Sequence, residues 1–113
     1  MLSKHCLANS AEIILAKEEG RLFSGFLFSF LVFDLGDDRL PRFAFVVSTK
    51  IDKRAVKRNR AKRLLKASIK FLFPRIKKGV IVVFLARKAI VGKDLASVRV
   101  ETEKMFEKAR LID

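Results

Sequence analysis

The chain has 113 residues, half of them hydrophobic, and a formal net charge of +13. This length suits a single domain over residues 1–113 whose core needs no disulfide or metal, and the single cysteine, Cys6, excludes an internal disulfide and favours a reducing compartment. The charge predicts a polyanionic partner, either nucleic acid or an anionic membrane. The longest nearly apolar stretch, 25–33, is too short for a membrane-spanning helix, and no signal-peptide pattern is present, so we expect a cytoplasmic protein.

The first half of the chain predicts a helix followed by strands. Residues 10–19 suit a short helix, with Asn9 or Ser10 as the N-cap and Gly20 as the stop. The Phe-, Leu- and Val-rich residues 21–33 indicate a short strand and a longer strand. A polar turn over 34–41 leads to a buried strand over 42–48, which makes a hairpin across this turn plausible.

The second half predicts a basic helix, a strand and a final helix. The basic helix should run from Asp52 or Lys53 to Leu72, with Asp52 as N-cap and Pro74 ending it. Residues 80–86 are apolar throughout and indicate a central strand. Asp94 or Ser97 then begins a helix with its apolar residues at helical spacing. This order predicts an α+β fold, with helices packed mainly on one face of a sheet.

The basic helix carries the clearest functional signal. From Lys53 to Lys78 there are twelve Lys and Arg residues and no Asp or Glu. Ordinary solvated faces mix charges of both signs because Glu and Lys four residues apart support a helix, so we interpret this face as a nucleic-acid-binding surface. The predicted RNA-binding residues are Lys53, Arg54, Lys57, Arg58, Asn59, Arg60, Lys62, Arg63, Lys66 and Lys70.

The helix also carries a motif. The segment from Ala55 to Lys66, AVKRNRAKRLLK, resembles the RNR signature helix of the bacterial ribonuclease P protein subunit. The likeness continues over nearly the whole chain, from a first helix ending at a glycine to the last helix. It implies a mixed four-stranded sheet in the order α-β-β-β-α-β-α, similar to the second domain of a small-subunit ribosomal protein. It also implies a left-handed crossover between parallel strands, which helical and strand periodicity cannot predict.

The resemblance further implies a function. The protein would be the subunit of the ribonuclease P endoribonuclease that binds the catalytic RNA and the 5′ leader of precursor tRNA, as a monomer in the holoenzyme, to assist 5′-end maturation. The family holds the leader in a cleft between the first helix and the sheet, and the candidates here are Ile13, Lys17, Phe28, Phe30, Ser48 and Lys50. This first helix lacks the aromatic residues that the family usually places there.

The residues offer no catalytic machinery. We find no Ser/His/Asp or Cys/His set and no metal-ligand pattern, so no catalytic residue and no protein-bound metal or cofactor is expected, and Mg2+ would be held by the RNA. One alternative is a ribosomal or other structured-RNA binding protein with no role in cleavage. Another is a DNA-binding or membrane-surface protein that uses the amphipathic helix.

Overall fold

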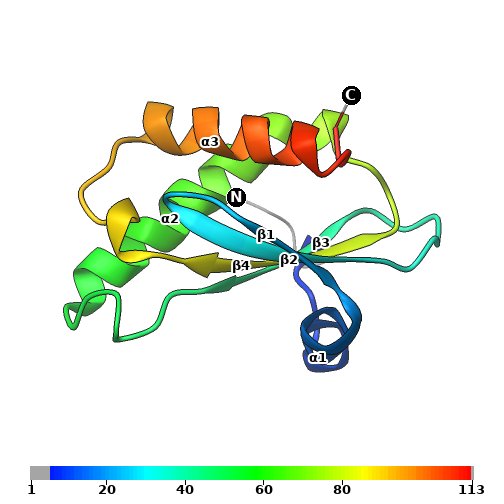
Figure 1. Cartoon of the computed structure of the whole chain (residues 1–113), viewed down its shortest axis with the longest axis horizontal. Helices are drawn as coiled ribbons and strands as arrows, with labels where there is room; N and C mark the ends of the chain where they lie inside the picture. The colour runs from blue at the N-terminus through cyan, green and yellow to red at the C-terminus, as the bar shows by residue number, and fades with distance from the viewer. Residues whose placement is uncertain (1–5, 113) are drawn as a thin grey trace.

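The computed structural model describes residues 6–112 and shows a sheet with helices on both faces (Figure 1). The order of helices and strands is the α-β-β-β-α-β-α order expected, with the short 3-10 helices η2 and η3 added. The elements are α1 (Ser10–Glu19), β1 (Arg21–Ser24), β2 (Phe28–Asp34), β3 (Arg42–Val46), α2 (Ala55–Leu72), η2 (Phe73–Arg75), β4 (Val80–Ala86), η3 (Lys88–Ile90) and α3 (Leu95–Lys108).

The four strands form one mixed sheet in the order β1-β2-β4-β3. β1 and β2 are antiparallel, β2 and β4 are antiparallel, and β3 and β4 are parallel. The predicted hairpin between β2 and β3 is therefore wrong, because β4 lies between them and Ile81 pairs with both Phe33 and Arg42. An entirely apolar strand buries both faces best at the centre of a sheet, and the chain reaches it through α2.

The two faces of the sheet carry unequal cores. α2 and α3 cover one face, whereas α1 alone packs against the other (Figure 1). Phe28, Phe30, Phe84 and Phe106 pack together in the larger core, with ring centroids 5.2 to 6.3 Å apart. The smaller core is centred on Ala16, Ile81 and Val83. The expected arrangement, with helices mainly on one face, is confirmed.

The ends of the helices follow local chemistry. Asn9 caps α1 in a capping box with Glu12, and α1 ends at Gly20. Asp94 caps α3 by accepting a hydrogen bond from Ser97 N at 2.9 Å. The predicted start of α2 is wrong: its N-cap is Arg54, which makes no side-chain capping bond, and the helix begins at Ala55. The Asp52 carboxylate instead accepts hydrogen bonds from the backbone N and the guanidinium of Arg54.

Candidate nucleic-acid interface

The outward face of α2 is the most basic surface on this helix. The helix buries Ala61, Leu65, Ser68, Ile69 and Leu72 against the body of the protein. Its opposite side presents the predicted polar residues: Asn59, Arg60, Arg63 and Lys70 are exposed, and Lys62 and Lys66 are half-buried. The period of the apolar residues fixes this orientation, because burying the apolar side turns the cations toward solvent.

No carboxylate neutralises this face. Within residues 6–112, the structure shows no ion pair between an acidic residue and any Lys or Arg of α2. Cations spaced three or four residues apart on a helix repel one another, and the helix dipole disfavours those in the first turn. The face therefore carries uncompensated positive charge in an ordered array, as expected of a surface that binds phosphate groups.

The face is also hollowed near its middle. A groove of about 350 Å³ is lined by Arg63, Lys66, Ala67 and Lys70. The Lys66 ammonium lies over the ring of Phe45 on β3, 5.7 Å from the ring centroid, which gives it a cation–π contact. Three cations thus surround a small alanine, so a phosphate group can approach the helix closely there.

The first turn of α2 is arranged differently. Arg58 was predicted to bind RNA, but its Nη1 donates to the backbone carbonyls of Asp52 at 3.0 Å and Lys53 at 2.8 Å. Arg58 therefore braces the segment that leads into α2 and holds that segment against the helix. The helix starts at Ala55, so Arg58 lies in the first turn, over this segment and not over the sheet.

The acid nearest the face is already paired. Asp52 Oδ2 lies 2.8 Å from Arg54 Nη2. Hydrogen bonds from the Arg54 guanidinium and backbone N lower the pKa of Asp52 to about 2. Asp52 is therefore ionised at neutral pH and offsets part of the charge of Arg54, and the charge of Lys57 also lowers the pKa of Asp52. Lys53 has no ion-pair partner among the residues described.

Known proteins resemble this chain in sequence and in fold. A family model described as Ribonuclease P matches residues 1–110. The chain belongs to this family. The ribonuclease P protein component of Clostridium kluyveri is 31% identical over 107 residues, which cover 93% of this chain and 94% of that protein. The component of Symbiobacterium thermophilum is 38% identical over 71 residues, or 63% of this chain, and the chain spans only 61% of that relative's length.

Ribonuclease P proteins from two further bacteria have the same fold as this chain. The Staphylococcus aureus protein superposes with a TM-score of 0.84 at 17% identity, covering 98% of this chain and all of that one. The Thermotoga maritima protein superposes with a TM-score of 0.76 at 25% identity, covering 86% of this chain and 92% of that one. The segment that resembles the RNR signature thus forms α2, and it lies within the residues that the family model matches.

Two residues predicted to line the leader cleft of ribonuclease P do not lie there. Phe28 and Phe30 are 0% exposed, in the core between the sheet and helices α2 and α3, so both predictions are wrong. Successive residues of a strand face opposite sides of the sheet, and the prediction took the wrong side. The polar residue Ser29 could have identified the correct side, because a polar residue in a strand marks its less buried face. Leu31 and Phe33 lie on that same face.

The other four cleft candidates lie on α1 and in the loop after β3. Ile13 is half-buried between α1 and the sheet, and Lys17 is exposed on α1. Ser48 and Lys50 are exposed in the loop after β3, where Ser48 Oγ accepts a hydrogen bond from Lys50 N at 3.2 Å. Their contact with a leader remains a prediction.

The prediction missed apolar side chains on the α1 side of the sheet. They are Ala44, Val46 and Leu85. The alternation along β3 could have identified two of them, because Phe43 and Phe45 pack in the larger core and leave Ala44 and Val46 for the other face.

The described residues contain neither a candidate metal cluster nor a candidate membrane-spanning helix. Within residues 6–112, no group of three or more His, Cys, Asp or Glu is placed to hold a metal ion. No helix in that range is both long enough and apolar enough to cross a membrane.

Proposed function

We propose that this chain is the protein subunit of ribonuclease P, which assists the catalytic RNA in removing the 5′ leader of precursor tRNA. The observation that carries the proposal is the outward face of α2, an ordered array of cations with no carboxylate partner within residues 6–112, in a chain of the ribonuclease P family. In this role α2 lies against the RNA, and the protein acts as a monomer in the cytoplasm, where precursor tRNA is made.

The contribution of the protein is electrostatic. The hydrolysis itself would belong to Mg2+ ions held by the RNA, which would activate a water as the nucleophile and stabilise the leaving oxygen. Lys62, Arg63, Lys66 and Lys70 neutralise phosphates and so reduce the repulsion between RNA segments that are brought close together. Less Mg2+ is then needed to hold the RNA in its active form.

Selection of the precursor follows from contact with the leader. The α1 side of the sheet offers apolar contacts from Ile13, Val46 and Leu85, with Lys17 and Lys50 available for phosphates. Precursor tRNA gains affinity from a leader bound there, whereas mature tRNA has no leader. The substrate is therefore bound more tightly than the product.

Leader removal at low Mg2+ tests the function. The purified chain is added to a bacterial ribonuclease P RNA at a Mg2+ concentration at which the RNA alone is nearly inactive, and cleavage of precursor tRNA is measured. We expect the chain to restore cleavage and a Lys62→Gln, Arg63→Gln, Lys66→Gln variant to restore much less. Binding without any gain in cleavage, and equal affinity for precursor and mature tRNA, would show a structured-RNA binding protein that has no role in processing.

A further inference from the structure

The turn between β1 and β2 is held rigidly. Gly25 N donates to Phe28 O at 2.9 Å, and Leu27 N donates to Glu101 Oε2 on α3 at 2.7 Å. Arg87, just after β4, donates from its backbone N to Leu27 O at 3.0 Å and from Nη1 to Gly25 O at 3.3 Å. A Cβ on Gly25 would lie 2.3 Å from Met105 Sδ, so the turn also packs closely on α3.

This braced turn presents an aromatic side chain to solvent. Phe26 is 69% exposed, whereas the next most exposed phenylalanine, Phe71 at 56%, has the guanidinium of Arg99 over its ring at 3.4 Å. A single exposed apolar residue is common in proteins and needs no explanation on its own. Phe26 differs because the backbone on both of its sides is held by α3 and Arg87, so little loop entropy is lost when its ring contacts a partner.

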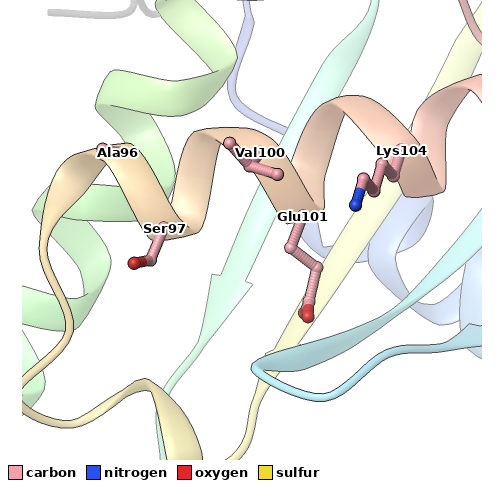
Figure 2. Close-up of a pocket in the computed structure, with 5 residues that line it drawn as sticks. All are labelled: Ala96, Ser97, Val100, Glu101 and Lys104. Carbon is pink, nitrogen blue, oxygen red and sulfur yellow. The ribbon is translucent and has the colours of Figure 1, made fainter.

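A groove lies beside the turn. It has a volume of about 470 Å³ and is lined by Ala96, Ser97, Val100, Glu101 and Lys104 on α3. Figure 2 shows the Glu101 side chain reaching from α3 toward the turn, and its carboxylate is the acceptor of the Leu27 N–H. The groove therefore adjoins the turn through Glu101.

The turn also lies at the same end of the sheet as the start of α2. Phe28 pairs with Ala86 at the end of β4, and Val46, at the end of β3, pairs with Leu85. The exposed cations Arg87 and Lys88 follow β4 at this end, and the segment that leads into α2 follows β3 (Figure 1). A nucleic acid that extends past the first turn of α2 thus meets further positive charge near Phe26.

We propose that the Phe26 turn and the adjoining groove on α3 form a second RNA contact, in which one unpaired base stacks on Phe26. Arg87 and Lys88 neutralise the phosphates on either side of that nucleotide. An unpaired base fits because every base offers a π-face to an aromatic ring, whereas bases within a duplex are already stacked. The exposed cations at this end of the sheet favour RNA over an apolar protein partner. The inference rests on the proposed role in RNA binding but concerns a surface separate from α2.

Substitutions at Phe26 test the contact because an exposed ring is not needed for folding. We compare Phe26→Ala, Phe26→Leu and Phe26→Trp in the full chain, with Leu22→Ala, 59% exposed on β1, as the matched control. The probes are a bacterial ribonuclease P RNA and a 12-nucleotide single-stranded RNA that contains 2-aminopurine, whose fluorescence is quenched by stacking. Melting temperature and sedimentation of the free proteins are measured in parallel.

Loss of one stacked base predicts an affinity about 5- to 150-fold lower for Phe26→Ala, with an unchanged melting temperature. Phe26→Leu should bind as weakly as Phe26→Ala, Phe26→Trp should keep the quenching, and Leu22→Ala should behave as wild type. Wild-type affinity in Phe26→Ala, or full affinity in Phe26→Leu, overturns the proposal. A change only in self-association overturns it as well and assigns the turn to a contact between copies of the protein.

The two proposals fail in different ways. If substitutions on α2 weaken RNA binding and Phe26→Ala does not, only the second contact is lost. If wild-type protein neither binds the ribonuclease P RNA nor restores its activity, the proposed function fails.

Discussion

Arg58 belongs to the signature of the basic helix, yet its guanidinium bonds to the chain itself. Its Nη1 holds the carbonyls of Asp52 and Lys53, so removing it frees the segment before α2. We predict that Arg58→Ala lowers the free energy of unfolding by about 1 kcal/mol and weakens RNA binding without changing the slope of log K against log salt. Arg63→Ala, the control, should reduce that slope by about 0.7 to 0.9. An equal reduction in Arg58→Ala would show a direct phosphate contact.

Asp52 offers a test of the structure before α2 that needs no RNA. Hydrogen bonds from Arg54 lower its pKa from 3.8 to about 2. A lowered pKa in the folded state means that the interaction stabilises the fold above pH 3.8 and is lost as the pH falls through about 2. We predict an NMR titration midpoint near 2 for the Asp52 carboxyl and a return toward 3.8 in Arg54→Ala. A midpoint near 3.8 in the wild type would contradict the ion pair.

Arg42 is a cation that serves the fold. Its side chain is fully buried, with Nε 3.3 Å from Glu12 Oε2 on α1 and Nη2 3.1 Å from Asp37 Oδ2 in the loop before β3. Removing one partner of a buried ion pair typically costs about 3 to 5 kcal/mol, because the other charge is left uncompensated. Both carboxylates here keep some exposure, so we predict a loss of about 3 kcal/mol for Arg42→Met, measured by urea unfolding. An unchanged urea midpoint would show that the pair contributes nothing.

At the scale of elements, α2 and β4 were the most predictable parts of the chain. The buried residues of α2 recur at helical spacing from Ala61 to Leu72, so the basic face could be assigned from the sequence. β4 is apolar from Val80 to Ala86, and its predicted bounds match those observed. Asn9, Gly20 and Asp94 act as the helix signals that their residue types indicate.

The remaining errors have non-local causes. The place of β4 between β2 and β3 depends on pairing between segments far apart in the chain, which no local pattern encodes. The face that Phe28 and Phe30 occupy depends on which side of the sheet carries two helices. Asp52 has the right residue type for an N-cap, but its carboxylate accepts hydrogen bonds from Arg54 instead. The helix therefore starts three residues later, at Ala55.

The outward face of α2 can be tested as one element. We predict that Lys62→Gln, Arg63→Gln and Lys70→Gln each weaken binding to ribonuclease P RNA and each reduce the salt slope by about 0.7 to 0.9, because each loses one phosphate contact. Lys108→Gln, an exposed cation in the last turn of α3, is the matched control and should keep the slope. Equal reductions at all four positions would indicate a diffuse effect of net charge and not a defined face.

At the scale of the whole molecule, charge is distributed unevenly. The chain has 25 Lys and Arg and 12 Asp and Glu, and none of the acids falls between Lys53 and Lys78. The ion pairs of the described residues use carboxylates of α1, α3, the end of β2 and the loops, and none of them involves α2. The cations of α2 therefore repel one another in the free protein, and this repulsion lowers the free energy of unfolding.

Salt should consequently act in opposite directions on folding and on binding. Raising the ionic strength from about 0.01 to 0.1 M shortens the screening length from about 30 to 10 Å, which weakens repulsion along α2 and attraction to RNA alike. We predict that the melting temperature of the free protein rises over this range while its affinity for RNA falls. In a Lys62→Gln, Lys66→Gln variant both trends should be shallower, because these residues lie four apart on α2 and each such like-charge pair destabilises a helix by about 0.2 to 0.5 kcal/mol. A melting temperature that falls with salt would contradict this prediction. It would mean that attractive ion pairs, such as those of Arg42, contribute more to stability than the repulsion between the cations of α2 removes.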